Sequence, residues 1–402
     1  MEGWKEIVFP EFIALQRGKD LTKTSFRSGS IPVAGSNGII GFHNIAIVKA
    51  PGVTIGRSGT CGKANFYKQD FWAHNTALYV KDFKGNDALF TYFFLVYFNA
   101  GRFKTGVSVP TLDRNSLNNV TVRIPPLPEQ RKIAYILSTI QKAIEQQDKL
   151  IKTTIELKKA LMQKLFTEGL YGEPQKETEI GLVPESWEVV ELGDICERIS
   201  ISIQPNPNGD KLYVGLEHII PGQIYLTDFG RESEVVSSKA AFKKGEILYG
   251  KLRPYLDKAV IAHFDGISST DILIFTGKND VENDFLIHFF HTEMLIDFAK
   301  STTTGVQHPR TSWSSLKKLK LGLPSKAERR FIAKSLNLFE NKLLFHQKKK
   351  QSLTALFKTL LHELMTGQRR VHKIDFWGLS EAESPDKEYR IEEQPLSVAA
   401  EK

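Results

Sequence analysis

Residues 124–137 read Ile-Pro-Pro-Leu-Pro-Glu-Gln-Arg-Lys-Ile-Ala-Tyr-Ile-Leu, and residues 323–336 read Leu-Pro-Ser-Lys-Ala-Glu-Arg-Arg-Phe-Ile-Ala-Lys-Ser-Leu. The second stretch repeats the first at an offset of 199 residues (328 − 129 = 199), with Pro, Glu, Arg, Ile-Ala and Leu in matched places. The match has no gap between Gly106 and Thr167. Solenoid repeats are only about 20 to 50 residues long. The offset therefore indicates one duplicated module, and two copies of a binding module favour a target with two halves.

A long helix is predicted after the repeated stretch in each copy. Apolar residues recur three and four positions apart, which is the spacing of helices paired in a coiled coil. Polar residues interrupt this seam at Gln147, Thr154 and Lys158, and again at His346 and Lys350. The residues expected to pack are Ile133, Leu137, Ile140, Ile144, Ile151, Leu161 and Leu165, and in the second helix Ile332, Leu336, Phe339, Leu343, Leu353, Phe357, Leu360 and Leu364. A core-facing helix of a globular bundle is the alternative, although helices beyond about 25 residues are unusual there.

The chain before each long helix is rich in short apolar runs and turns. Asn37-Gly38 is a strong hairpin signal within residues 1 to about 123. One buried helix is expected over Leu89–Phe98, closed by Gly101. Thr54–Arg57 is similar to Leu248–Lys251, so the duplication extends into these β-rich regions.

Composition points to an intracellular protein with a polyanionic partner. The net charge is +8, and the eight acidic and four basic residues from His372 to Lys402 leave +12 on residues 1–371. A basic body of this kind favours a polyanion. Two cysteines without CxxC spacing argue against a disulfide framework and fit a reducing cytosol. We expect a cytoplasmic location and no membrane contact, because there is no recognisable signal peptide and no apolar run long enough to span a membrane.

No set of residues in the sequence predicts catalysis or metal binding. Gly59–Lys63 resembles a phosphate-binding loop, but it lacks the glycine and the Ser or Thr that this motif needs at its two ends. Cys196 stands at an apolar position, which favours packing. His288 and His291 lie three apart on an expected helix and could ligate a metal. Because no HExxH or carboxylate pattern accompanies them, packing or partner contacts are favoured.

The signal for binding lies in loops where basic and small polar residues meet glycine. Arg and Lys supply charge and paired donors for base edges, Ser, Thr and Asn add neutral donors, and Gly gives phosphates access to the backbone. Such loops recur at matched places in both copies, which favours binding over the usual solvated surface charge. The candidate DNA-contacting residues are Ser36, Asn37, Arg57, Ser58, Thr60, Lys63, Lys104, Ser108 and Arg114 in the first copy, and Lys251, Arg253, Tyr255, Lys258, Thr303, Gln307 and Arg310 in the second.

Two β-rich modules, each followed by a long helix, resemble the specificity subunit of type I restriction-modification enzymes. The most specific similarity is the run Pro126–Ala134, taken together with the duplication. The resemblance covers residues 4 to 371, although residues 323–330 of the second copy depart from the first. Further similar stretches are Ile31–Gly41, Leu161–Gly169, Leu182–Glu188 and Leu360–Gly367.

This resemblance implies an α+β fold in which a two-helix antiparallel coiled coil separates two β-rich target recognition domains with pseudo-twofold symmetry. The recognition domains and helices would then share the chain with a linker and an acidic, disordered tail. The expected boundaries are residues 1–125 for target recognition domain 1, 126–168 for the first long spacer helix, 169–184 for the linker, 185–323 for target recognition domain 2, 324–369 for the second spacer helix and 370–402 for the tail.

The resemblance also implies a non-catalytic subunit that reads an asymmetric, bipartite and gapped site in double-stranded DNA. Two modification subunits would methylate adenine with base flipping, and two restriction subunits would translocate and cleave DNA. S-adenosylmethionine, ATP and Mg²⁺ are expected on those partner subunits. No cofactor, metal or catalytic residue is expected on this chain.

Three other interpretations can be separated from this one. A coiled-coil scaffold joining two ligand-binding β modules would show no salt-dependent retention on DNA. The specificity portion of a fused methylating enzyme should carry methylase motifs, which this sequence lacks. A standalone enzyme should show turnover with S-adenosylmethionine and DNA.

Overall fold

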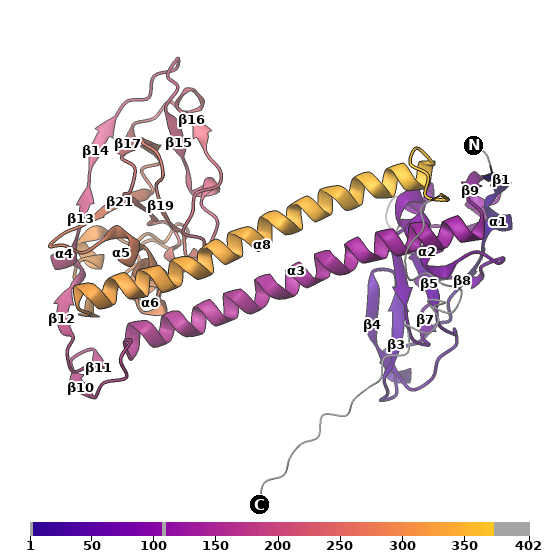
Figure 1. Ribbon diagram of the computed structural model, residues 1–402, viewed down its shortest axis with the longest axis horizontal. Helices are drawn as coiled ribbons and strands as arrows, with labels where there is room; N and C mark the ends of the chain where they lie inside the picture. Colours follow the sequence, from indigo (N-terminus) through magenta and orange to yellow (C-terminus); the bar gives the residue numbers. More distant parts are fainter. Residues whose placement is uncertain (1–2, 107–109, 374–402) are drawn as a thin grey trace, which may run out of the picture. The chain divides into compact units, whose positions relative to one another are not determined.

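A computed structural model describes residues 3–106 and 110–373 of the 402-residue chain (Figure 1). The chain divides into two compact units. Unit 1 comprises residues 1–146 and 350–402, and unit 2 comprises residues 147–349. Each unit therefore holds one β-rich module, the beginning of one long helix and the end of the other.

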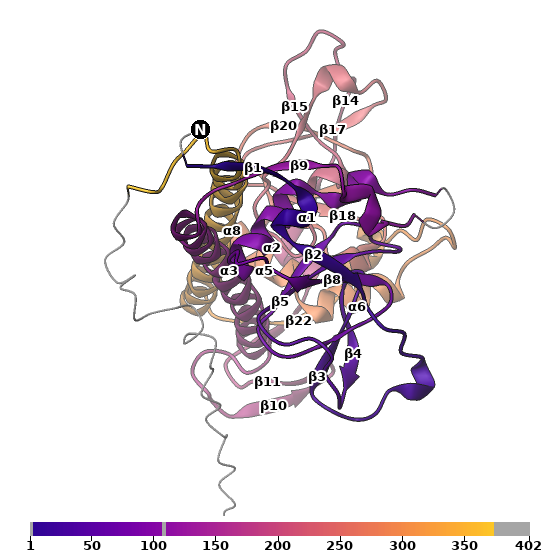
Figure 2. The ribbon, with the colours of Figure 1, turned by 90° about the vertical axis from the view of Figure 1, so that its right-hand side faces the viewer.

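Unit 1 starts with a strand pair that joins the two ends of its module. β1 (Lys5–Val8) is antiparallel to β9 (Thr121–Ile124), directly before the long helix α3 (Leu127–Thr167). The main sheet has the order β2–β8–β5–β6, and a second sheet has the order β4–β3–β7. Figure 2 shows β3 and β4 of the second sheet side by side. The remaining bounds are β2 Ala14–Arg17, β3 Ile31–Gly35, β4 Gly38–His43, β5 Gly52–Gly56, β6 Ala64–Tyr67, β7 Trp72–Ala73, β8 Ala77–Asp82, α1 Phe9–Phe12, α2 Ala88–Phe98, and the 3-10 turns Lys23–Ser25, Ala100–Phe103 and Arg114–Leu117.

The buried helix expected over Leu89–Phe98 is confirmed as α2. The Asp87 side chain caps it by accepting from the Phe90 N–H at 2.7 Å. The expected end at Gly101 is wrong, because Asn99 takes the left-handed conformation (φ 48°) and ends the helix. An Asn is one of the few non-glycine residues that reaches this conformation readily. The phenylalanines of α2 share one core with the start of α3 and the end of α8 (Lys326–Thr366).

Unit 2 repeats this plan with additions. β12 (Glu188–Glu191) pairs with β22 (Lys320–Leu323) before α8, and the four-stranded sheet has the order β13–β21–β18–β19. A five-stranded sheet, β14–β17–β20–β15–β16, has more strands than its unit 1 counterpart. The remaining bounds are β13 Cys196–Ile199, β14 Ile201–Ile203, β15 Leu212–Val214, β16 Gly230–Arg231, β17 Lys239–Phe242, β18 Ile247–Gly250, β19 Ala259–Ile261, β20 Gly266–Ser268, β21 Ile272–Gly277, α4 Leu192–Ile195, α5 Asn283–Phe290, α6 Glu293–Ser301, α7 Trp313–Leu316, and the 3-10 turns Leu216–His218, Glu232–Glu234 and Pro254–Leu256.

The stretch interpreted as a linker, residues 169–184, is folded. β10 (Gln175–Thr178) and β11 (Gly181–Pro184) form an antiparallel hairpin there. The sequence pattern missed it, because β10 is polar throughout and β11 buries the adjacent Val183 and Pro184, so neither strand shows an apolar alternation. The predicted start of the tail at residue 370 is also too early, since Val371 is buried in the unit 1 core. Residues 374–402 lie outside the described part of the chain.

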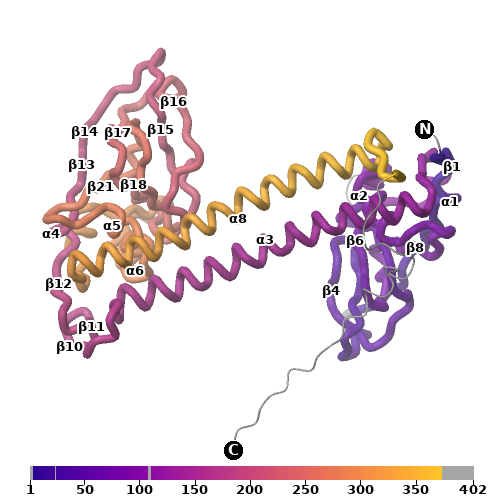
Figure 3. The backbone as a smooth tube through the Cα atoms, viewed as in Figure 1, coloured from indigo at the N-terminus to yellow at the C-terminus, as the bar shows by residue number. Residues whose placement is uncertain are grey.

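The two long helices are each unbroken over 41 residues (Figure 3). At 1.5 Å per residue each is about 60 Å long. In unit 1, Ile133 and Leu137 of α3 pack with Leu364 of α8. In unit 2, Leu165 of α3 packs with Ile332 of α8. The start of each helix thus meets the end of the other, which makes the pair antiparallel. Two of the other expected packing residues, Leu336 and Leu343, are buried. The rest are half-buried, namely Ile140, Ile144, Ile151, Leu161, Phe339, Leu353, Phe357 and Leu360.

Four of the five polar interruptions of the seam, Gln147, Thr154, Lys158 and His346, are buried in unit 2. Gln147 is buried, and its Oε1 accepts a 2.9 Å hydrogen bond from His346 Nδ1. Lys158 forms a buried ion pair with Glu340. Positions 147 and 346 are related by the repeat offset, so this contact joins one residue to its own counterpart. Such a contact is what a local twofold axis through the helix pair produces.

A buried glutamate at the start of each long helix anchors it to its unit. In unit 1, Glu129 accepts from Trp4 Nε1 at 3.2 Å and from Arg370 at 2.9 Å. In unit 2, Glu328 accepts from Trp187 Nε1 at 3.0 Å and from the Leu170 N–H at 2.7 Å. Burial would raise the pKa of Glu129, but the hydrogen bonds from Arg370, the Val371 N–H and Trp4 hold it below its ordinary value.

Candidate nucleic-acid interface

Three loop segments of unit 1 are held together by backbone hydrogen bonds at the end of β5. The Gly56 N–H donates to the Lys63 carbonyl at 2.9 Å, which closes the loop between β5 and β6. The Leu112 N–H donates to the Arg57 carbonyl at 2.7 Å. Thr105 and Thr111 exchange two backbone hydrogen bonds of 2.8 Å, which close the base of the loop that follows Lys104. Ser108 lies outside the described residues.

The side chains of this cluster are tied to a neighbouring hairpin. Lys63 Nζ donates to Asn37 Oδ1 at 2.8 Å, and Asn37 lies in the turn between β3 and β4. Gly56 is required where the loops meet, because a Cβ there would lie 1.9 Å from the Thr60 carbonyl oxygen and 2.5 Å from that of Ser36. The predicted residues Ser36, Asn37, Thr60 and Lys63 therefore come together from separate parts of the sequence.

Unit 2 builds its loop cluster with the same backbone hydrogen bonds. The Gly250 N–H donates to the Lys258 carbonyl at 2.8 Å, as Gly56 does to Lys63. The Thr311 N–H donates to the Lys251 carbonyl at 3.0 Å, as Leu112 does to Arg57. Thr304 and Arg310 exchange two bonds of 3.0 Å, as Thr105 and Thr111 do. The similarity of Thr54–Arg57 to Leu248–Lys251 thus corresponds to equivalent positions in the two folds.

Acidic and basic side chains meet at the surface of the unit 2 cluster. Arg310 donates to both oxygens of Asp271, from Nε at 2.8 Å and from Nη2 at 3.0 Å. Lys251 Nζ lies 3.9 Å from the same carboxylate. The hydrogen bond from Arg310 holds the pKa of Asp271 below its ordinary value. The Arg310 side chain is still 41% exposed, so its guanidinium can meet a ligand while its orientation is fixed.

Arg253 and Tyr255 stand on the exposed part of the same loop. Arg253 has a left-handed backbone (φ 51°), and its N–H donates to the Pro309 carbonyl at 2.8 Å. Asp257, also left-handed, accepts at 2.6 Å from Nδ1 of the buried His291. Loop 251–258 is therefore held in one shape from two sides, with Tyr255 exposed.

Several other predicted residues have side chains that bond to the backbone of the fold. Lys258 Nζ donates to the Leu216 carbonyl at 2.6 Å, and Thr303 Oγ1 to the Lys300 carbonyl at 2.8 Å, so both side chains have partners within the fold. Arg114 Nη1 donates to the Leu15 carbonyl at 3.4 Å, and none of its described contacts joins it to the loop cluster. Ser58, Lys104 and Gln307 belong to loop segments of the two clusters, and Lys104 and Gln307 are exposed.

Asp271 was missed by sequence reasoning. It follows Ser269 and Thr270 between two strands, and nothing in that local pattern marks a partner for Arg310, which is 39 residues away. A search for acidic residues next to predicted strand ends would have found Asp271 among many others. Its role depends on tertiary structure.

The side chains of His288 and Cys196 are buried and have structural roles. His288 is fully buried beside Asn337, and burial lowers its pKa to about 3, so it stays neutral. Burial raises the pKa of Cys196 to about 12, so its thiol stays protonated. Across residues 3–106 and 110–373 no group of three or more His, Cys, Asp or Glu side chains is placed to hold a metal ion. In that same part of the chain, no helix combines the length and apolarity needed to cross a membrane.

Comparison with protein families identifies the family of the chain that carries these two clusters. The family described as the type I restriction modification DNA specificity domain matches residues 1–156 and 184–355, which is more than half of the chain. The chain belongs to this family. The role of type I specificity subunits is DNA sequence specificity, and each of the two matched stretches contains one loop cluster.

Individual specificity subunits show the same relationship. The MjaVIII specificity subunit of Methanocaldococcus jannaschii is 27% identical over 291 residues, covering 67% of each chain. The EcoDI specificity subunit of Escherichia coli is 22% identical over 368 residues, covering 82% of this chain and 80% of the relative. The fold is similar to that of the solved type I restriction-modification S subunit from M. genitalium, with a TM-score of 0.65 and 18% identity over 90% of this chain and 96% of that one. The expected fold class, two β-rich modules with an antiparallel coiled coil, is thereby confirmed.

Proposed function

We propose that this specificity subunit reads an asymmetric, bipartite and gapped DNA site, one half with each loop cluster. The observation that carries the proposal is the pair of clusters, which share three backbone hydrogen-bond patterns and differ in their side chains. Unit 1 presents Arg57 and an Asn37–Lys63 pair, whereas unit 2 presents Arg253 and an Arg310–Asp271 pair. Different donors and acceptors read different base edges, so the two half-sites should differ.

The long helices suit the role of a spacer between half-sites. Half-sites on one face of DNA lie about one helical turn, roughly 34 Å, apart. Helices of 41 residues are about 60 Å long, which is sufficient to set such a separation. In this proposal the helix pair determines the length of the gap, and the loops determine the bases on either side.

Catalysis in this proposal belongs to partner subunits. Two modification subunits carrying S-adenosylmethionine would dock on the helices and methylate adenine, and two restriction subunits would use ATP and Mg²⁺ to translocate and cleave. The chain itself would be non-catalytic and would act in the cytoplasm. Exposed apolar side chains on the helix pair of unit 2 support docking there, because large apolar side chains grouped on a surface mark interaction sites.

A binding selection from random DNA tests the proposal. The assembled complex of this chain with its modification subunits is mixed with random duplexes, and the retained sequences are read at several salt concentrations. We expect two short unlike motifs at a constant spacing, with retention that falls steeply as salt rises. One contiguous motif would contradict the bipartite site, and retention independent of sequence and salt would favour the scaffold interpretation.

A further inference from the structure

The helix pair of unit 2 carries a row of exposed apolar side chains outside its seam. On α8, Phe331, Leu338 and Phe345 follow one another at intervals of seven residues, and Leu338 and Phe345 are 68% and 60% exposed. On α3, Leu150 and Leu157 have the same interval and are also exposed. An interval of seven keeps side chains on one stripe of a helix. The seam itself is already filled, so these residues form a second apolar stripe.

All five side chains lie on one face of the helix pair. Each stands directly before a seam position, and therefore about 100° around its helix from the seam. A twofold axis perpendicular to an antiparallel pair exchanges the two helices and keeps such flanks on the same face. Because Gln147 lies level with His346, the order along this face is Phe345, Leu150, Leu338, Leu157 and Phe331. The face extends about 20 Å along the pair.

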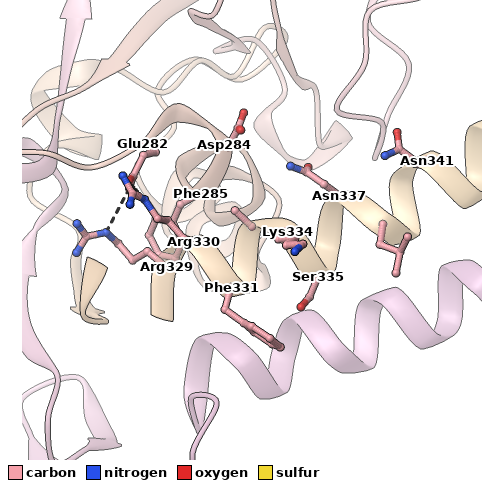
Figure 4. A pocket seen from close by; sticks show the side chains of 12 residues that line it. Glu282, Asp284, Phe285, Arg329, Arg330, Phe331, Lys334, Ser335, Asn337 and Asn341 are labelled. Carbon is pink, nitrogen blue, oxygen red and sulfur yellow. Dashed lines mark hydrogen bonds and ion pairs between the residues drawn. The ribbon is translucent and has the colours of Figure 1, made fainter. Parts of the chain in front are cut away.

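The α8 edge of this face is basic, and a cavity adjoins it. The lysines that border the stripe on α8 are exposed, namely Lys334, Lys342, Lys348 and Lys349. The two acidic residues of α8 within unit 2, Glu328 and Glu340, are both buried. This cavity of about 670 Å³ lies between α5 and α8, with Phe331, Leu338, Lys334 and Arg330 on the α8 side and the acidic Glu282 and Asp284 at α5. Figure 4 shows Phe331 and Ser335 on the side of α8 opposite Asp284.

The matching positions of unit 1 have a different character. Subtracting 199 from Phe331, Leu338 and Phe345 gives Lys132, Thr139 and Gln146. The counterpart of Leu150 is Lys349, and that of Leu157 is Leu356, the one large apolar residue among the five counterparts. The apolar seam positions recur in both units, whereas this outer face is apolar in only one of them. A partner with one docking surface would therefore meet two unequal sites.

We propose that the face formed by Phe331, Leu338, Phe345, Leu150 and Leu157 is the primary docking site for the first modification subunit, and that its counterpart in unit 1 takes the second one more weakly. The occupant is an amphipathic helix whose apolar stripe is bordered by Asp and Glu, because the face is apolar in the middle and basic along its edge. Assembly is then ordered, with a 1:1 complex preceding the 1:2 complex. The inference rests on the proposed function, since it assigns an order to the docking of the same partners.

Titration of the purified modification subunit of the same system into the full chain tests this order. Wild type is compared with Leu338→Lys and with the matched control Thr139→Lys, and native mass spectrometry counts the complexes formed. We expect Leu338→Lys to weaken the first association about ten- to a hundredfold, as loss of a buried leucine contact does. Thr139→Lys should leave the first association unchanged and weaken only the second. Phe345→Lys provides a second test at the same face.

The outcomes separate this inference from the proposed function. Two equal associations, or equal effects of Leu338→Lys and Thr139→Lys on both steps, would overturn the order of assembly and leave the proposed function standing. A dimer of the chain alone that Leu338→Lys abolishes would overturn the choice of occupant. A wild-type chain that binds no modification subunit would overturn both. Because Leu338 is exposed, unchanged thermal unfolding of each variant should confirm that the fold is intact.

Discussion

The loop clusters of the two units share a backbone and differ in what they present on it. In unit 1, Lys63 is held by Asn37 of the neighbouring hairpin. In unit 2 the matching Lys258 donates to the Leu216 carbonyl, and Arg310 is held by Asp271 instead. A common frame with divergent side chains is what duplication followed by separate selection on two half-sites would leave. The comparison teaches that the side chains of the loops changed while the turns that position them were retained.

The largest expected effect concerns the helix seam, where the units also differ. Glu340→Ala leaves the buried Lys158 ammonium group without its ion-pair partner. Removing one member of a buried ion pair costs about 3–5 kcal/mol, and urea unfolding should show that loss of stability. The matched control is Gln141→Ala at the equivalent place in unit 1, where Gln141 bonds the exposed Glu145 and the expected cost is below about 0.5 kcal/mol. Similar costs for the two variants would show that the seam polarity is not specific to unit 2.

Variants in the two clusters should impair DNA recognition independently, each at its own half-site. Arg57→Ala and Arg253→Ala are each expected to weaken DNA binding of the assembled complex by about 1–3 kcal/mol if the side chains touch bases. Each should relax specificity in one half-site only, which a binding selection with each variant would reveal. Arg253→Gly controls for the left-handed backbone, since glycine adopts that conformation without strain. Unchanged affinity and specificity in both alanine variants would remove these residues from the interface.

Acid should destabilise unit 2 through His288. Its pKa is about 3 in the folded chain and ordinarily 6.5, so the unfolded state binds a proton that the folded state excludes. The stabilisation is present above pH 6.5 and is lost as the pH falls toward 3. Unfolding free energy at pH 5 should be about 2 kcal/mol lower than at pH 7. Urea unfolding of His288→Asn should lack most of this pH dependence, and an unchanged slope would assign it to other groups.

The smallest effect is expected at Asp271. Asp271→Asn keeps the shape of the side chain and removes the charge that orients Arg310. A partly exposed ion pair contributes at most about 1 kcal/mol, so a loss of fivefold or less in DNA affinity is expected by fluorescence titration. The effect should appear only at the half-site that Arg253→Ala alters. A loss at the other half-site would contradict the assignment of Arg310 to the unit 2 cluster.

The sequence predicted what is encoded locally or by repetition. Heptad spacing predicted a long helix after each repeated stretch, and the structure has these helices at Leu127–Thr167 and Lys326–Thr366. Sequence similarity alone aligned the Gly-Arg turn at Gly56 with the Gly-Lys turn at Gly250. In the structure the two turns make the same backbone hydrogen bond, to the Lys63 and Lys258 carbonyls. The individual DNA contacts remain predictions.

Contacts between distant residues could not be predicted in this way. The bond from Trp187 to Glu328 spans 141 residues, and the one from Arg310 to Asp271 spans 39. Neither pair forms a motif, because each depends on how strands and helices pack. The β10–β11 hairpin was missed for another reason, since neither strand has the alternation of apolar and polar residues that marks a half-buried strand.

Mapping of adenine methylation in a host genome tests the central claim most directly. The host is sequenced with wild-type chain, with Arg57→Ala and with Arg253→Ala, each assembled with the modification subunits. Two unlike readers on one spacer predict a methylated motif of two different halves with a constant gap, in which each variant relaxes its own half alone. A single uninterrupted motif, a gap of variable length, or relaxation of both halves by one variant would contradict the account.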